Sequence, residues 1–208
     1  MIKRRKKILP KTVTTEQVAE MKKHITKERD RLAVDLLLHT GMRISELVGI
    51  TWEDVGEWTR ENNTWNMAKP KKSLLIRSEI AKNRRERVIP LNDNARRVIE
   101  ALKADLINAG RAPIPSHAVV QGKIPGKHLS KRQFQRIISK ASKQAGITIN
   151  VTPHKFRHTF ATNLLNANID IRTLQELLGH ENLNTTQIYT HVSEEKMRMA
   201  VKKLEKKE

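Results

Sequence analysis

The sequence predicts a mostly α-helical domain with one small antiparallel β-sheet, the α+β fold class. Apolar residues that recur every three or four positions favour helices over most of the chain. Helix-capping residues such as Thr14 and Asp170 precede several of these segments. Between residues 73 and 89, two short apolar runs are separated by a basic segment, which is typical of a β-hairpin.

The first half of the chain is predicted to contain three helices and this hairpin. The expected elements are a basic linker over 1–12, helices over 14–29, 32–38 and 44–50, and strands over 73–77 and 87–89. Thr14 and Gln17 have the spacing of a capping box, and Gly41 is placed to end the second helix, which is apolar on most faces. Residues 57–72 are polar, with two tryptophans, and we expect a longer connection or an extra strand there.

The second half is predicted to be helical apart from one long loop. The expected elements are a helix from 92 or 93 to about 109, a loop over 109–129, helices over 130–144, 152–166 and 170–179, and a last helix from 193. Thr152 followed by Pro153 is a strong helix start. The apolar stripe of the last helix either packs on its own domain or docks on a neighbouring protomer. That stripe consists of Met197, Ala200, Val201 and Leu204.

The charge of the chain predicts a polyanionic partner. Lysine and arginine number 41 against 22 aspartates and glutamates, which gives a formal net charge of +19. The basic run at 3–7 supplies only five of these cations, so the surplus is spread along the chain and nucleic acid is the expected partner. Aromatic residues make up 3% of the chain, which argues against recognition of single strands by rows of stacked rings.

Several classes of protein are excluded by what the sequence lacks. No run of about 18 apolar residues is present, so no membrane span is expected. The basic N-terminus is not followed by an apolar segment long enough for a secretory signal. Cysteine is absent, which excludes disulfides and thiolate metal sites and fits a reducing interior.

The segment 154–158, His-Lys-Phe-Arg-His, has more than one interpretation. Two histidines four residues apart on a helix can bind zinc, but no glutamate follows the first one and Arg157 would repel the cation. Alternatively, the histidines pack or cap. The segment is also part of a larger ordered set. That set comprises Arg43 after a Thr-Gly turn, Lys82 ahead of a basic strand ending in Val-Ile-Pro, His154, Arg157, His180 in Leu-Gly-His, and Tyr189, the only tyrosine.

This set resembles the signature of the tyrosine recombinases, the λ-integrase-type family, over about residues 14–192. The resemblance implies the catalytic-domain fold of that family over 13–208. The gap between Arg43 and Lys82 looks long for the family, and Lys72 and Arg84 are alternatives for the lysine position. Only a short linker precedes residue 13, so the N-terminal core-binding domain usual in the family is expected to be absent, either by excision or because the protein is naturally short.

The chemistry implied is cleavage and rejoining of DNA through a 3′-phosphotyrosine bond. Arg43 and Arg157 would hold the non-bridging phosphate oxygens, because guanidinium groups stay charged and donate in pairs. Tyr189 would be the nucleophile and His154 its general base. His180 would bond the phosphate, and Lys82 would protonate the leaving 5′-oxygen. His158 is interpreted as structural.

No metal, cofactor or ATP is expected in this scheme. Further contacts with double-stranded DNA are expected from basic residues of the hairpin and of the helix that starts at 130. These are Arg84, Arg85, Arg87, Lys131 and Arg132. We expect a monomer without DNA and a homo-tetramer on DNA, in the cytoplasm of a bacterial, archaeal or phage-infected cell and associated with the nucleoid. Two alternatives remain, a type IB topoisomerase-like enzyme and a non-catalytic DNA-binding module.

Overall fold

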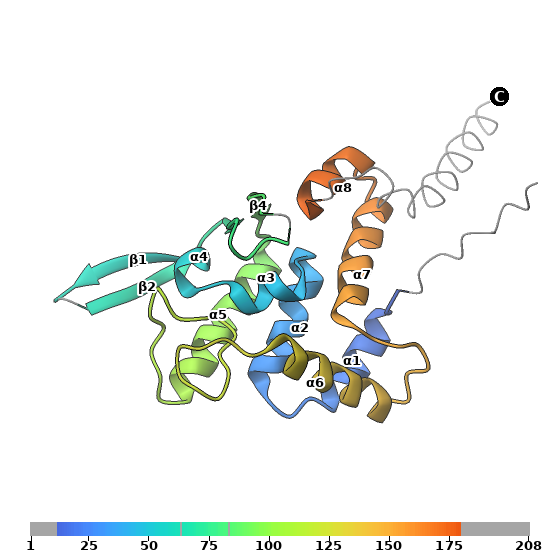
Figure 1. Cartoon of the computed structure of the whole chain (residues 1–208), viewed down its shortest axis with the longest axis horizontal. Coiled ribbons are helices and arrows are strands. Elements are labelled where there is room, and N and C mark those ends of the chain that lie inside the picture. Colours follow the sequence, from blue (N-terminus) through green and yellow to red (C-terminus); the bar gives the residue numbers. More distant parts are fainter. Residues whose placement is uncertain (1–11, 63, 83, 180–208) are drawn as a thin grey trace, which may run out of the picture.

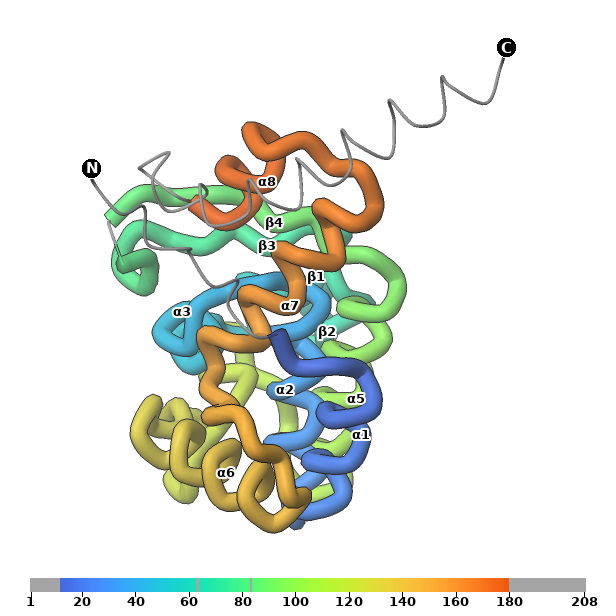
Figure 2. The backbone as a smooth tube through the Cα atoms, turned by 90° about the vertical axis from the view of Figure 1, so that its right-hand side faces the viewer, coloured from blue at the N-terminus to red at the C-terminus, as the bar shows by residue number. Residues whose placement is uncertain are grey.

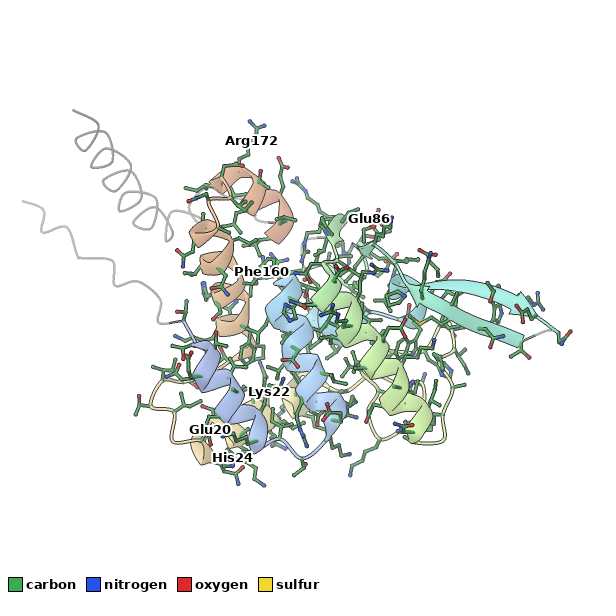
Figure 3. The ribbon with its side chains drawn as sticks, turned by 180° about the vertical axis from the view of Figure 1, so that it is seen from behind. Glu20, Lys22, His24, Glu86, Phe160 and Arg172 are labelled. Atoms are coloured by element: carbon green, nitrogen blue, oxygen red, sulfur yellow. The ribbon has the colours of Figure 1, made fainter. Side chains whose placement is uncertain are left out.

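A buried helix, α2 (Glu28–Thr40), runs through the middle of the structure (Figure 1). The computed structural model describes residues 12–62, 64–82 and 84–179. α2 packs against α5 (Asp93–Asn108) on one side and α7 (Pro153–Asn166) on the other, and Figure 3 shows these helices side by side. Leu36 and Leu37 of α2 are fully buried, which confirms the prediction of a core helix over 32–38.

The first helix, α1 (Thr15–Lys23), begins as predicted but ends earlier than the expected Arg29. Thr14 and Gln17 form the predicted capping box. Beyond Lys23 the chain turns so that Ile25 enters the core, where it is 2% exposed. The Ile25 carbonyl then accepts a 2.8 Å hydrogen bond from Nε of Arg31 on α2. Burial of Ile25 thus separates one expected segment into the end of α1 and the start of α2.

Two short helices follow α2. α2 ends at Gly41, whose φ of +61° is the left-handed conformation expected of a C-cap glycine. Helix α3 (Ile44–Gly49) then starts directly after Arg43. Helix α4 (Trp52–Val55) follows and brings the fully buried Trp52 into the core.

The described residues contain two separate two-stranded antiparallel sheets instead of the single sheet expected. The predicted hairpin is formed by β3 (Ser73–Ile76) and β4 (Arg87–Pro90). The polar stretch after α4 forms a second hairpin from β1 (Gly56–Glu61) and β2 (Thr64–Pro70). Figure 1 shows this second hairpin projecting away from the helices, which explains why its residues are largely polar.

The remaining helices lie close to their predicted bounds. Helix α6 (Lys131–Gln144) is capped by Ser130 and packs on α1. The long loop over 109–129 is present without a helix. Helix α8 (Ile171–Leu178) is capped by Asp170 at its start and by Gly179 at its end, and it lies beside β4 (Figure 2). The helix expected from 193 lies outside the described residues. Within the described ranges, no helix is long and apolar enough to cross a membrane.

Candidate active site

The centre of the candidate site is the buried carboxylate of Glu46 on α3. Arg87 on β4 binds it with both terminal nitrogens, Nη1 to Oε1 at 2.7 Å and Nη2 to Oε2 at 2.6 Å. Arg43 adds a 2.9 Å bond from Nη1 to Oε1 and a 2.7 Å bond from its backbone N–H to Oε2. Burial alone would raise the pKa of Glu46, but the hydrogen bonds and charges of Arg87 and Arg43 outweigh it and lower that pKa.

Arg157 on α7 is the third guanidinium of the site, and it is 2% exposed. Its Nη1 donates to the carbonyl of Gly41 at 2.8 Å, and its Nη2 donates to the carbonyl of Leu178 at 2.5 Å. The first bond joins Arg157 to the turn that precedes Arg43. The two arginines expected to hold a phosphate are therefore brought to the same place by contacts between distant parts of the chain.

The C-terminal end of α8 completes this arrangement. Three successive carbonyls there each accept a hydrogen bond from a different arginine. Leu177 accepts from Nε of Arg87 at 3.1 Å, Leu178 accepts from Arg157, and Gly179 accepts from Nη2 of Arg43 at 3.1 Å. The last carbonyls of a helix lack partners inside it and carry partial negative charge, so guanidinium groups stabilise this end of α8.

His154 lies at the start of α7, one turn before Arg157. The residue is exposed, but the atoms around its ring still desolvate it in part, and this lowers its pKa below the usual 6.5. The positive charges of Arg157, Arg43 and Lys82 lower the pKa of His154 further. An uncharged imidazole is consequently favoured beside the arginines, as an acceptor of protons must be.

His158 contacts His154 edge to face, with ring centroids 4.4 Å apart. Burial lowers the pKa of His158 to about 4, with smaller contributions from His154, Lys155 and Arg157. This environment fits the structural interpretation of His158. No group of three or more metal-binding side chains occurs among residues 12–62, 64–82 and 84–179, which leaves the zinc interpretation without support there.

Lys82 is exposed in the loop between β3 and β4. Its charge acts on His154, which places it on the same side of the molecule as the arginines. Of the alternatives, Lys72 lies at the opposite end of this hairpin, where its carbonyl accepts from the backbone of Leu91. Arg84 is exposed in the same loop as Lys82. His180 and Tyr189 lie outside the described residues, and the chain leaves the described part at Gly179, within the arginine cluster.

The residues expected to bind DNA fall into two groups. Arg84, Arg85, Lys131 and Arg132 are exposed. The side chain of Arg87 is only 9% exposed and its donors are used by Glu46 and Leu177. In this structure the guanidinium of Arg87 binds acceptors of the protein itself, so its expected DNA contact stays a prediction.

Glu46, three residues after Arg43, was not among the site residues expected from the sequence. A usable signal exists. Glu46 is the third residue of α3 and its carboxylate caps the backbone N–H of Arg43. Its neighbours Leu47 and Val48 are apolar and buried. A glutamate at this capping position within an apolar helix indicates a buried carboxylate that needs cationic partners.

Comparison with known proteins identifies the family of this chain. The profile of the Phage integrase family matches residues 9–196. The chain is 34% identical over 200 residues to tyrosine recombinase XerD of Halalkalibacterium halodurans, covering 92% of this chain and 60% of that protein. It is 38% identical over 175 residues to tyrosine recombinase XerC of Bacillus subtilis, covering 82% and 51%.

Among solved structures, the fold is similar to that of the XerH site-specific recombinase bound to its difH substrate in a pre-cleavage complex. The TM-score is 0.64 at 26% identity, over 91% of this chain and 53% of that chain. The fold and the site together define a mostly helical domain that gathers several arginines in one place. The chain belongs to the phage integrase family of tyrosine recombinases. It spans 51–60% of the length of the two relatives named above.

Proposed function

We propose that this chain is the catalytic part of a site-specific DNA recombinase that cuts and rejoins duplex DNA through a covalent bond to Tyr189. The observation that carries the proposal is the convergence of Arg43 and Arg157 at the end of α8, ten residues before Tyr189 in the chain. Its relatives named as tyrosine recombinases support the same activity. Residues 13–208 would form this catalytic domain.

The charge balance of the site suits a single phosphodiester. Arg43, Arg87 and Arg157 bring three positive charges, and the carboxylate of Glu46 offsets one of them. The remaining positive charge attracts a backbone phosphate and stabilises the additional negative charge that its oxygens carry in the transition state. Rigid attachment of the arginines to carbonyls and to Glu46 keeps the reorganisation needed for phosphate binding small.

The proposed reaction forms one phosphoester bond for each one that it breaks. The Tyr189 oxygen attacks phosphorus, and the bond to the 5′-oxygen breaks as the phosphotyrosine bond forms. His154, whose pKa is lowered, accepts the tyrosine proton. Lys82 gives a proton to the 5′-oxygen, and His180 donates a hydrogen bond to the phosphate. Reversal of the same steps by another 5′-hydroxyl rejoins the strand without ATP.

The DNA would lie along the side of the molecule that carries the exposed basic residues. Figure 2 shows α3, the loop between β3 and β4, and α6 along one side of the structure. Arg84 and Arg85 are in that loop, and Lys131 and Arg132 are in the first turn of α6. Side chains on this side would contact several phosphates of one duplex. We propose a monomer in solution, a homo-tetramer on two duplexes, and a place at the nucleoid in the cytoplasm.

A covalent-adduct assay tests this proposal. The chain, alone and fused to a core-binding domain, is incubated with a nicked duplex that carries the target site of the recombinase. A protein–DNA adduct that survives SDS is expected from wild type and absent from Tyr189→Phe. Equal adduct from both would contradict the assignment of the nucleophile. Relaxation of supercoiled plasmid without any recombinant product would indicate a type IB topoisomerase-like activity, and binding without adduct would indicate a binding module.

A further inference from the structure

We propose that Arg87 is a positioning residue of the cleavage site, which orients Arg43 and the end of α8 without touching DNA. This inference rests on the proposed function. Arg87 was expected on the DNA-facing surface because of its place in a basic strand. The structure instead surrounds it with acceptors of the protein itself, the two oxygens of Glu46 and the carbonyl of Leu177.

The first link runs from Arg87 through Glu46 to Arg43. Glu46 is completely buried and its Oε1 accepts from both Arg87, at 2.7 Å, and Arg43, at 2.9 Å. A buried carboxylate shared by two guanidiniums binds each one less tightly than it would bind either alone. Arg87 therefore weakens the attraction between the Glu46 carboxylate and the Arg43 guanidinium. The charge of Arg43 then remains available to a phosphate.

The second link runs from Arg87 to the segment that leads to His180. Nε of Arg87 binds the Leu177 carbonyl, and Cδ of Arg87 lies 3.0 Å from the position that a Cβ on Gly179 would take. Arg87 thus contacts the end of α8 at Leu177 and Gly179, next to the carbonyl that Arg43 binds. Loss of Arg87 removes one of the three bonds that fix this helix end.

The third link is the hairpin. Arg87 pairs with Ile76 in the last register position before the loop that carries Lys82. Its neighbour Glu86 is exposed (Figure 3), so burial changes from one residue to the next at this point. Arg87 therefore joins the base of the Lys82 loop to α3 and α8. A lysine at this position would keep the charge but has one nitrogen, which cannot bind both Glu46 oxygens and the Leu177 carbonyl in this geometry.

The test compares Arg87→Gln and Arg87→Lys with Arg172→Gln, an exposed arginine at the far end of α8 (Figure 3). Adduct formation is measured with ordinary nicked DNA and with DNA whose cleaved bond carries a 5′-bridging sulfur, a leaving group that needs no proton. Equilibrium DNA binding is measured in parallel. We expect both Arg87 variants to bind DNA within about threefold of wild type and to form adduct about 100-fold more slowly, as for a small misplacement of catalytic groups.

The sulfur substrate separates two routes of action. The sulfur substrate should restore the rate of adduct formation of Lys82→Ala, because Lys82 supplies a proton that a sulfur leaving group does not require. The Arg87 variants should stay slow, because their defect lies in Arg43 and the end of α8. Restoration of Arg87→Lys to wild-type rate would overturn the inference, as would a loss of DNA binding equal to the loss of adduct.

A readout that does not depend on cleavage keeps this inference separate from the proposed function. The side-chain Nε–H signal of Arg43, assigned by its absence in Arg43→Lys, is followed by ¹⁵N NMR. It should shift in Arg87→Lys and stay in place in Arg172→Gln. If wild type forms no adduct while the Arg43 signal shifts, the proposed function fails and the positioning of Arg43 by Arg87 stands. An unchanged Arg43 signal overturns the inference whether or not DNA is cleaved.

Discussion

Phe160 on α7 fills the space that a side chain on Gly41 would need. A Cβ at Gly41 would lie 2.2 Å from Cδ1 of Phe160, well inside the distance that real atoms tolerate. Figure 3 shows Phe160 where α7 faces α2. The close approach lets Arg157, also on α7, reach the carbonyl of Gly41. A glycine in the Thr-Gly turn thus permits the close approach of α7, which carries Arg157, to the end of α2.

Gly41→Ala should destabilise the fold more than a glycine substitution in open space. Gly41 and Gly110 both have positive φ, +61° and +71°, so alanine is strained at either position. Nothing lies within 4 Å of a Cβ at Gly110. Urea denaturation should show an additional loss of about 1–3 kcal/mol for Gly41→Ala, the usual range for overpacking. Equal losses for the two variants would show that Phe160 moves aside freely.

Glu46→Gln should destabilise the protein at neutral pH and change how the free energy of unfolding depends on pH. Removal of one partner of a buried charge cluster costs about 3–5 kcal/mol. The folded-state pKa of Glu46 is below its usual 4.5. Glu46 therefore contributes stability above pH 4.5, and this contribution is lost as pH falls through the folded-state pKa. Urea denaturation across pH 3–7 measures both effects, and the exposed Glu86→Gln is the control.

In that series the wild-type curve should fall more steeply below pH 4.5 than the Glu46→Gln curve. The Glu86→Gln curve should follow wild type, because Glu86 is exposed. Parallel curves for wild type and Glu46→Gln would mean that Glu46 is not held ionised by Arg87 and Arg43.

Arg43→Lys should reduce cleavage strongly while leaving the charge of the chain unchanged. Arg43 binds Glu46 and Gly179 through different nitrogens, and lysine has a single nitrogen for both. Loss of one oriented donor typically slows such reactions by about 10²–10³-fold. The rate of adduct formation measures this, with Arg172→Lys as a matched control. A loss of less than about tenfold would indicate that a point charge is sufficient at this position.

Lowering the pH should inhibit cleavage with a midpoint below 6.5, the usual pKa of histidine. The pKa of His154 is lowered from 6.5 by partial desolvation and by the charges of Arg157, Arg43 and Lys82, so its uncharged form predominates at pH 6.5 and above. As pH falls through the lowered pKa, protonation removes the acceptor for the tyrosine proton. Single-turnover adduct rates should fall to half of their value at pH 7.5 only at a pH below 6.5. A midpoint at or above 6.5 would contradict this role, and His24→Gln on the exposed end of α1 should not change the profile.

Local signals in the sequence predicted the helix ends well. The caps at Thr14, Gly41 and Asp170 act through hydrogen bonds within a few residues, and all three occur as expected. The end of α1 was not predicted, because no glycine or proline marks it and burial of Ile25 decides it. The β1–β2 hairpin was left open between strand and connection, because its exposed strands have little apolar alternation.

The site was only partly predictable, because its contacts join residues that are far apart in the sequence. The order of motifs suggested Arg43 and Arg157, and the structure places them at neighbouring carbonyls. The environment of Arg87 depends on Glu46, which lies 41 positions away, and no local pattern specifies such a pair. A basic strand therefore suggested a surface contact where tertiary packing produced an internal one.

The bonds that secure the end of α8 join residues separated by 21, 90 and 136 positions. During synthesis on the ribosome, Arg43 and Arg87 emerge long before Leu177 and Gly179 do. The three arginines can therefore meet at the end of α8 only after residue 179 has been made, so this part of the cluster forms late.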